Sequence, residues 1–212
     1  MLTKQTVSRF LDELASASPT PGGGSAAALA GALGSALSSM VCNLTIGKKK
    51  YEAVQAEMKQ VLRKSEELRG LFTAMIDRDA DAFNKVMEAY SLPKENENQK
   101  ALRSAAIQGA TKEAALVPLE LMKHVIDAFA LTQTVAEKGN ASSVSDAGVS
   151  AMMLHAACES AAINVLINLA GIRDTEFVGW KEEEVSSLRR TSESKLRETL
   201  EIVNRRIAAS PG

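Results

Sequence analysis

Apolar side chains recur at helical spacing along most of this 212-residue chain. The pattern predicts helices at residues 6–14, 26–46, 48–90, 101–138, 146–170 and 181–208. Aromatic residues make up only 4% of the chain, whereas residues that favour helices over strands are abundant. We therefore expect an all-α fold. With 45% hydrophobic residues and no evident linker, the chain can bury one core, so we expect a single helical-bundle domain over residues 1–212.

Two of the predicted helices, residues 26–46 and 146–170, carry almost no charge and are expected to be central partners. In the first, small residues form two rows with a four-residue spacing: Ala27, Gly31, Ser35 and Ser39, and Ala30, Gly34 and Ser38. Such rows let another helix backbone approach closely, within the chain or across a subunit interface. This helix is long enough to span a membrane, but its Ala, Gly and Ser content favours burial in protein.

A seven-residue apolar pattern runs through residues 48–90 and predicts one long helix with an apolar seam. Asp79 falls on this seam, where an apolar residue is expected. Burial would raise the pKa of its carboxyl and a nearby cation would lower it, so Asp79 could serve as a general base or as a fixed negative charge. The alternative is a structural carboxylate that caps a neighbouring helix or pairs across it.

Prolines, glycines and small polar residues predict where helices begin and end. Pro118 should kink or restart its helix, and Gly139 should end that helix as a left-handed C-cap. Ser25 follows a loop rich in proline and glycine and is the expected N-cap of the first charge-poor helix. Ser145 and Asp146 should provide the N-cap and the first-turn negative charge of the second.

Charge and cysteine content narrow the function. The 25 basic and 26 acidic residues leave a net charge of −1, so no positive field would hold a nucleic acid or an anionic membrane. Cys42 and Cys158 are expected to be buried thiols in a reducing compartment, and we expect no metal site. His124 and His155 are expected to be packing or surface residues. The N-terminus lacks the apolar segment of a signal peptide, which favours the cytoplasm.

Three polar features could bind a ligand. Lysines 48–50 could clamp carboxylates or phosphates, or simply form a solvated turn at a helix C-terminus. The glycines at 22–24 lead into a helix N-terminus, which suits an anion, but they lack the ending of a P-loop. Ser160, Asn164 and Asn168 form a row whose buried amides must find partners in helix backbones or in a ligand.

Five segments occur together in register. They are TPGGGS at 20–25, SMVCNLTIGKKKY at 39–51, DADAF at 79–83, Gly139-Asn140 with Ser145-Asp146, and NVLIN at 164–168. Together they resemble the cyclodeaminase/cyclohydrolase family of folate enzymes over nearly the whole chain. Residues 40–51 and the free-standing length look most like the cyclohydrolases of bacteria. The resemblance implies an all-α homodimer or larger assembly, with the folate in a cleft near the subunit interface.

The resemblance also implies an activity: reversible hydrolysis of 5,10-methenyltetrahydrofolate to 10-formyltetrahydrofolate, with no metal or other cofactor. An alternative within the family is a formiminotetrahydrofolate cyclodeaminase that releases ammonia. An alternative of another class is a non-catalytic helical protein that only dimerises. A folate substrate and a homodimeric partner are therefore expected, without nucleic acid or membrane.

On this resemblance, we expect Asp79 to act as the base and Lys48, Lys49, Lys50 or Tyr51 to act as the acid. Asparagines and an aspartate suit the pterin ring, and lysines suit the tail carboxylates. The residues expected to contact the substrate are Gly22, Gly23, Gly24, Asn43, Asn140, Ser145, Asp146, Asn164 and Asn168. Of these, Asp146, Asn164 and Asn168 are the candidates for the pterin end, while Lys48 and Lys49 are the candidates for the tail.

Overall fold

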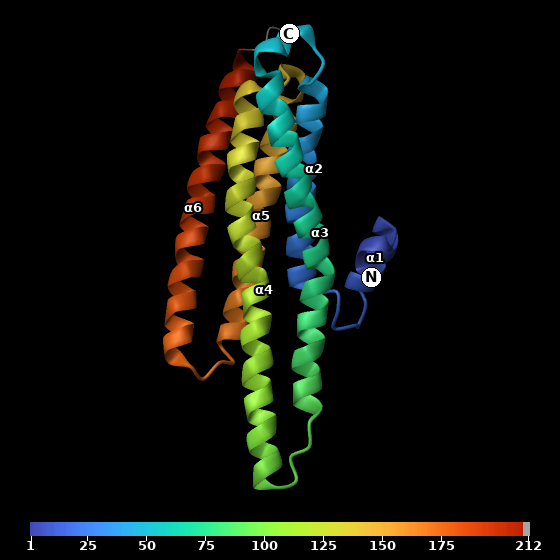
Figure 1. Ribbon diagram of the computed structural model, residues 1–212, viewed down its shortest axis with the longest axis vertical. Helices are drawn as coiled ribbons and strands as arrows, with labels where there is room; N and C mark the ends of the chain where they lie inside the picture. The colour runs from blue at the N-terminus through green and yellow to red at the C-terminus, as the bar shows by residue number, and fades with distance from the viewer. Residues whose placement is uncertain (210–212) are drawn as a thin grey trace.

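The computed structural model describes residues 1–209, and every regular element in them is helical. The α-helices are α1 (Val7–Leu14), α2 (Gly23–Thr45), α3 (Gln55–Ser91), α4 (Glu97–Lys138), α5 (Val144–Leu169) and α6 (Thr175–Ala208), and the 3₁₀ turns are η1 (Leu2–Lys4), η2 (Lys49–Val54) and η3 (Ala141–Ser143). Helices α2 to α6 form a bundle in which each helix runs antiparallel to the one before it, while α1 stands to one side (Figure 1). The all-α expectation is confirmed.

Helix α2 packs closely on two neighbours because its two rows of small residues face different helices. A Cβ atom at Gly31 would lie 2.9 Å from the Phe72 ring of α3. A Cβ atom at Gly34 would lie 2.9 Å from Leu154 Cγ of α5. The rows therefore bring α3 and α5 of the same chain close to α2, and the two charge-poor helices pack against each other as predicted.

Three buried hydroxyls join α2, α4 and α5 in the centre of the bundle. Ser38 Oγ lies 2.9 Å from Thr132 Oγ1 and 3.0 Å from Ser150 Oγ. Ser150 donates to the Gly34 carbonyl at 2.7 Å, and Thr132 donates to the Ala128 carbonyl at 3.0 Å. Because the Ser38 hydroxyl can donate to either neighbour, all three protons have an acceptor and their burial leaves no hydroxyl proton without a partner.

The apolar seam of α3 is buried as predicted, at Met58, Val61, Ser65, Leu68, Phe72, Met75 and Ala89. The helix itself begins at Gln55, after η2, so the prediction of one helix from residue 48 is wrong at its start. The Gln55 side chain explains this: its amide donates to the Tyr51 carbonyl at 3.1 Å, and its Oε1 accepts from the Gly47 N–H at 2.9 Å. These bonds hold the preceding segment as a compact turn.

Two expectations for α4 differ in part from the structure. α4 is a single helix through the buried Pro118, so the expected restart of the helix there is wrong. Gly139 is the C-cap of α4, as predicted, but its φ of −70° is not left-handed. A Cβ there would lie 2.5 Å from Val135 O and 2.6 Å from Val41 Cγ1, so this position needs glycine because α2 passes so close.

Two predicted N-caps also differ from the structure. Gly22 is the N-cap of α2, and the Ser25 hydroxyl instead donates to the Ile76 carbonyl of α3 at 2.9 Å. Ser143 is the N-cap position of α5, because η3 leads directly into the helix, and Ser145 lies inside it. Asp146 lies in the first turn of α5, as predicted.

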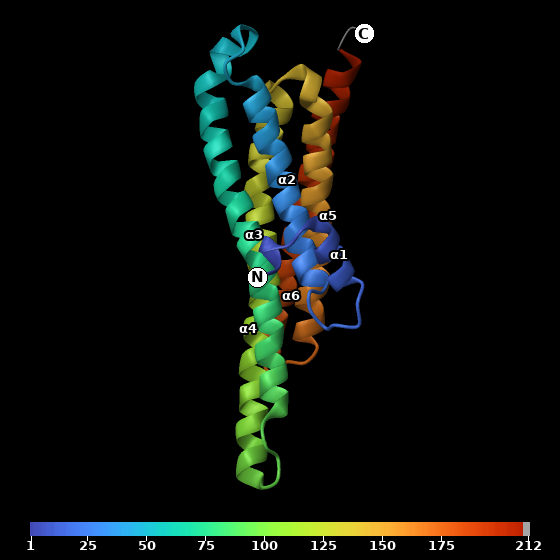
Figure 2. The same ribbon diagram turned by 90° about the vertical axis from the view of Figure 1, so that its right-hand side faces the viewer.

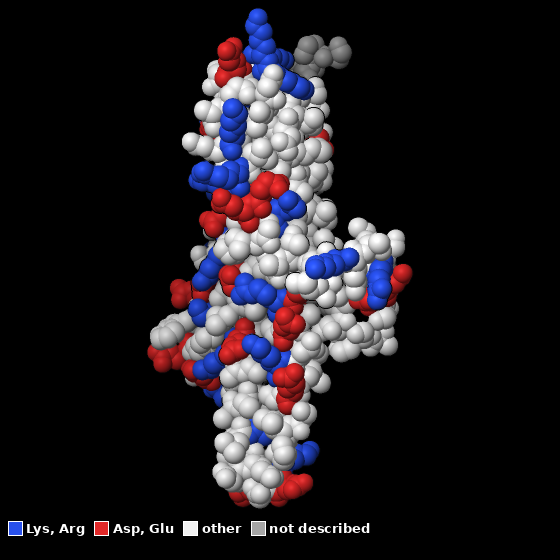
Figure 3. Space-filling model, turned by 45° about the vertical axis from the view of Figure 1, so that its right-hand side comes forward, with Lys and Arg blue, Asp and Glu red and all other residues white. Residues whose placement is uncertain are grey.

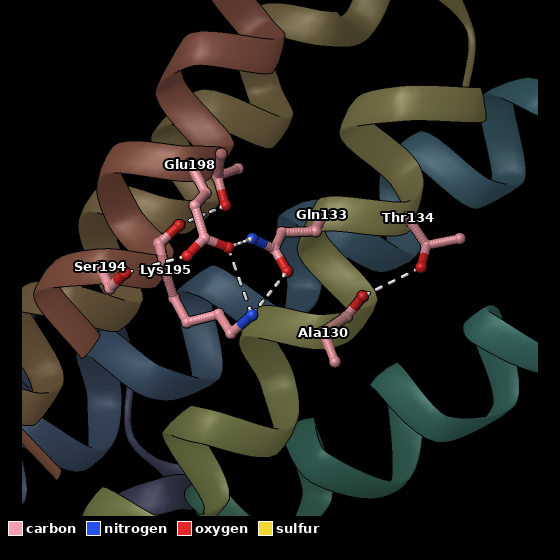
Figure 4. Close-up of polar contacts among 7 residues, drawn as sticks. Ala130, Gln133, Thr134, Ser194, Lys195 and Glu198 are labelled. Atoms are coloured by element: carbon pink, nitrogen blue, oxygen red, sulfur yellow. Dashed lines mark hydrogen bonds and ion pairs between the residues drawn. The ribbon is translucent and has the colours of Figure 1, made fainter. Parts of the chain in front are cut away.

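Helix α6 is the outer, charged helix that the sequence predicts. Its own Val185 and Val203 are buried against the bundle. Its polar side chains also reach α4 (Figure 4). Gln133 of α4 donates to Glu198 at 2.9 Å, and Lys195 lies 3.3 Å from the same carboxylate. The N-cap Asp174, which accepts from the Phe177 N–H at 3.1 Å, explains why α6 begins before residue 181.

Among the described residues, no other helix lies in front of α2 and α5 over much of their length (Figure 2), and few charged side chains appear on the upper part of this side of the bundle (Figure 3). Its exposed large side chains are Leu33, Met40, Leu44, Val149, Met152, Ile163 and Ile167, which we call the α2–α5 face. Helix α2 and the segment Ala141–Leu169 are long and apolar enough to cross a membrane, yet 61% and 44% of their apolar windows are buried in the bundle. Core helices of soluble proteins have the same properties.

The contacts of the glycines predict opposite effects of the same substitution. Gly34→Ala should lower the free energy of unfolding by about 1 to 2 kcal/mol, because the new methyl group overlaps Leu154 and outweighs the gain in helix propensity. A Cβ added at Gly70 in α3 would have no neighbouring atom of residues 1–209 within 4 Å. Gly70→Ala should therefore raise the free energy of unfolding by up to about 1 kcal/mol. Urea denaturation at one protein concentration measures both, and equal shifts would contradict this account of α2 packing.

Candidate functional site

Asp79 of α3 lies against the N-terminus of α2. A Cβ atom at Gly24 would overlap the Asp79 carboxylate, so only glycine permits this approach. The Ser25 hydroxyl shares its proton between the Ile76 carbonyl at 2.9 Å and Asp79 Oδ2 at 3.1 Å. The Asp79 carboxylate faces the first turn of a neighbouring helix, as the structural interpretation expects, and it also lines a cavity, as a role toward a ligand requires.

Burial raises the pKa of the Asp79 carboxyl above its ordinary value of 3.8. The hydroxyl and the backbone N–H of Ser25 act in the opposite direction, since both stabilise the charged form. No cation contributes to the shift. Asp79 is therefore a more basic carboxylate than one on the surface, which suits proton transfer.

The cavity beside Asp79, which we call the Asp79 cavity, has a volume of about 330 Å³. It is lined by Pro19, Thr20, Gly22, Gly23, Gly24, Asp79, Ala82, Phe83, Val86, Ala114, Asn164, Ile167 and Asn168. Six of the predicted site residues meet here: the three glycines, Asp79 and both asparagines. Phe83 belongs to the 79–83 motif but was not among the predicted site residues; its position four residues after Asp79 places both on one face of α3.

Asn164 and Asn168 line this cavity, and their side-chain amides bond within α5. Asn164 Nδ2 donates to the Ser160 carbonyl, and Asn168 Nδ2 donates to the Asn164 carbonyl, each at 2.8 Å. No hydrogen bond from residues 1–209 reaches either Oδ1 atom. These two oxygens are therefore available to accept from N–H groups of a ligand.

The remaining predicted residues lie at the opposite end of α2, where Tyr51 and Asn140 tie the chain together. The Tyr51 hydroxyl donates to Asn140 Oδ1 at 3.3 Å and accepts from the Ala141 N–H at 2.9 Å. Asn140 Nδ2 donates to the Leu44 carbonyl at 3.0 Å, and its backbone N–H donates to Thr45 Oγ1 at 2.8 Å. Both side chains hold the α4–α5 turn, and their roles toward a substrate stay predictions.

Around this turn, Asn43, Lys48, Lys49 and Ser145 are exposed, and Asp146 is half-buried. No ion pair within residues 1–209 involves either lysine or Asp146. The residue that the sequence reasoning missed here is Gln55, which organises the segment before it. A glutamine in an otherwise regular helical pattern carries no signal of such a role.

The two groups of predicted residues are separated by the length of α2. Its 23 residues correspond to about 35 Å. A single chain therefore brings together the glycines, Asp79 and the asparagines, and does not bring Lys48, Lys49, Tyr51 or Asp146 to them.

Known proteins are similar to this chain in sequence and in fold. The family described as formiminotransferase-cyclodeaminase matches residues 6–187. The methenyltetrahydrofolate cyclohydrolase of Methylorubrum extorquens is 50% identical over 188 residues, which cover 89% of this chain and 90% of that protein. The formimidoyltransferase-cyclodeaminase of Mus musculus is 35% identical over 179 residues, or 84% of this chain, but this chain spans only about a third of that protein (33%).

The fold agrees with these relatives. The crystal structure of formiminotetrahydrofolate cyclodeaminase from Thermotoga maritima matches with a TM-score of 0.87 and 32% identity, covering 98% of this chain and 100% of that one. With the family match over most of its length, the chain belongs to the formiminotransferase-cyclodeaminase family.

Proposed function

We propose that this chain is a methenyltetrahydrofolate cyclohydrolase, which adds water to 5,10-methenyltetrahydrofolate and forms 10-formyltetrahydrofolate in one-carbon metabolism. The observation that carries the proposal is Asp79, a half-buried carboxylate of raised pKa that lines a cavity together with two asparagines whose Oδ1 atoms accept no hydrogen bond from residues 1–209. The Methylorubrum extorquens relative, which bears this name and is 50% identical, supports it.

The proposed reaction begins with water attacking the methenyl carbon, an electron-poor amidinium centre. Asp79 stabilises the cation before the attack and takes the proton from the water as the C–O bond forms. The adduct then loses its hydroxyl proton as the C=O bond forms and the C–N5 bond breaks, N5 takes up a proton, and the formyl group stays on N10. The net reaction releases one proton to solvent. The reaction involves no change of oxidation state, so we expect it to need no redox cofactor.

The two asparagines orient the bound pterin ring. The pterin ring carries N–H donors at its pyrimidine end, and the Oδ1 atoms of Asn164 and Asn168 are acceptors without partners in the chain. Backbone at Gly23 and Gly24 approaches the cavity without side chains. We propose that the pterin binds between these elements, with its reactive carbon near Asp79.

The second candidate is formiminotetrahydrofolate cyclodeaminase, favoured by the likeness to the Thermotoga maritima enzyme of that name. The formimino nitrogen would leave as ammonia while the methenyl ring closes. Both reactions pass through a tetrahedral carbon between the folate nitrogens, so the same cavity serves either. Ammonia release from formiminotetrahydrofolate, measured beside hydrolysis of the methenyl compound, distinguishes them.

We also propose that the enzyme is a cytoplasmic homodimer whose subunits meet through the α2–α5 face. In a symmetric dimer, each patch contacts the same patch of the partner. A twofold axis across the middle of this face places the Lys48 and Asp146 end of one chain beside the Asp79 cavity of the other. Such a dimer brings the two separated groups together, and the partner's lysines can then protonate the leaving nitrogen.

Replacing the proposed base tests the mechanism. Asp79→Asn should reduce kcat about 10²- to 10⁴-fold, because the amide accepts a hydrogen bond but cannot take a proton. Loss of the near-ultraviolet absorbance of methenyltetrahydrofolate measures the rate, and circular dichroism checks that the helices remain. Asn84→Asp on an exposed part of α3 is a control for altered charge. Wild-type turnover in Asp79→Asn would sink the assignment.

The same variant should not be less stable at neutral pH. Because burial raises the Asp79 pKa in the fold, ionised Asp79 disfavours folding at pH values above that raised pKa. Asp79→Asn removes this effect, so its Tm at pH 7 should equal or exceed that of the wild type. The difference should shrink as the pH falls from the raised pKa toward 3.8, where the wild-type carboxyl takes up its proton. A Tm difference independent of pH would contradict the assigned cause.

Mixing two inactive variants tests the shared site. Asp79→Asn and Lys48→Gln remove groups that one chain holds about 35 Å apart. If the partner supplies the lysine, mixed dimers contain one intact site, and refolding equal amounts together should restore about a quarter of wild-type activity. Absence of complementation, with dimers present, would refute the shared site.

A charge on the α2–α5 face tests the proposed dimer interface. Met152→Glu should shift the wild-type dimer to monomer in analytical ultracentrifugation.

A further inference from the structure

A second cavity lies directly beyond the Asp79 cavity along the bundle. Its volume is about 400 Å³, and we call it the cationic cavity; it is lined by Tyr90, Lys94, Lys100, Arg103, Ser104, Ile107, Gln108, Gly171 and Arg173. On α3, Val86 lines the first cavity and Tyr90, one turn further, lines the second. After Asn168 the α5–α6 turn continues in the same way to Gly171. The two cavities are therefore neighbours, where α3 and α4 extend past the end of α5 (Figures 1 and 2).

The cationic cavity carries positive charge that the chain does not neutralise. Four basic side chains line it, and no carboxylate from residues 1–209 does. Lys100 pairs with Glu97 at 2.7 Å. Within residues 1–209, Lys94, Arg103 and Arg173 form no ion pair with any carboxylate. This contrasts with arginines such as Arg78, whose guanidinium lies 2.8 Å from Glu120.

Both arginines are held in place by neutral groups. Two nitrogens of Arg103 donate to the Tyr90 carbonyl at 3.1 and 2.9 Å, and its guanidinium lies 5.5 Å from the centre of the Tyr90 ring. Arg173 Nη1 donates to Ser104 Oγ at 3.1 Å. The Gln108 side chain fixes the adjoining turn, accepting from the Arg173 N–H and donating to the Gly171 carbonyl, both at 2.8 Å. Guanidinium groups positioned in this way bind carboxylates with little further ordering.

An exposed apolar surface connects the two cavities. Phe83, Met87 and Tyr90 follow one another on the same face of α3, and they are 36%, 50% and 51% exposed. Phe83 lines the Asp79 cavity and Tyr90 lines the cationic cavity. A ligand that reaches from one cavity to the other would cover these side chains, and an aromatic ring in its middle would pack on them.

We propose that the cationic cavity binds the carboxylates of the glutamate tail of the substrate, while the aminobenzoyl ring lies over Phe83 and Tyr90. This proposal rests on the proposed function, because the tail belongs to a folate. Asp79 and Tyr90 are about 16 Å apart along α3, a span suited to an aryl ring, an amide and one glutamate. Arg103, Arg173 and Lys94 then take the role that the sequence suggests for Lys48 and Lys49.

A ligand without the pterin tests the cavity independently of catalysis. p-Aminobenzoyl-tri-γ-glutamate should bind the wild type in isothermal titration calorimetry. The double variant Arg103→Gln, Arg173→Gln should bind it about tenfold to a hundredfold more weakly, as expected for the loss of charge-assisted hydrogen bonds. Binding should be unchanged in Lys48→Gln, Lys49→Gln and in Arg197→Gln, a matched control whose arginine pairs with Glu193 on α6.

Lys94→Gln removes one charge from the cavity without removing a hydrogen bond that holds the backbone, so it guards against misfolding of the arginine variants. It should weaken binding about two- to fivefold, as expected for one exposed charge. The proposal is overturned if the wild type does not bind the probe, or if only the Lys48, Lys49 variant loses binding.

Kinetics separate this proposal from the proposed function. In the arginine variants, KM for methenyltetrahydrofolate should rise and kcat should stay unchanged, whereas KM for methenyltetrahydropteroate, which lacks glutamate, should not move. An active wild type whose arginine variants treat both substrates alike would overturn the tail site alone. A wild type without hydrolase activity whose probe binding still depends on Arg103 and Arg173 would overturn the proposed function alone.

Discussion

The close approach of α2 to its neighbours is the constraint on which the rest of the structure depends. At Gly31 and Gly34 a missing Cβ lets Phe72 and Leu154 touch the α2 backbone, and at Gly24 it admits the Asp79 carboxylate. The contacts at Gly31 and Gly34 determine how the core packs, and the contact at Gly24 determines where the Asp79 carboxylate lies. All three glycines belong to α2. Packing and chemistry therefore share the same geometry, so a change in the tilt of α2 would alter both.

Much of the fold could be predicted from the sequence because helical periodicity is a local property. The buried seam of α3 and the pairing of the two charge-poor helices follow directly from it. The differences lie at Pro118, which does not restart its helix, at Ser25, which bonds to α3 instead of capping α2, and at Gly139, which ends α4 without the left-handed conformation. Such contacts depend on the tertiary arrangement, which periodicity does not contain.

The candidate site was predictable only in part. Asp79 stood out because a charge interrupts an apolar seam, and Asn164 and Asn168 stood out as a polar row. Nothing in their spacing shows that they share a cavity, because antiparallel packing of three helices brings them together. Arg103 and Arg173 gave no signal at all, since each is an ordinary charged residue in its own segment. Only the fold shows that no carboxylate accompanies them.

The burial of the two thiols has a chemical consequence for the protein. Cys42 and Cys158 are free and lie within the bundle, and burial raises their pKa values to about 12 and about 11. Thiolate is the form that reacts with oxidants and alkylating agents, and at neutral pH almost none of it forms at either position. The burial that completes the core therefore also disfavours oxidation of both sulfurs while the bundle is folded.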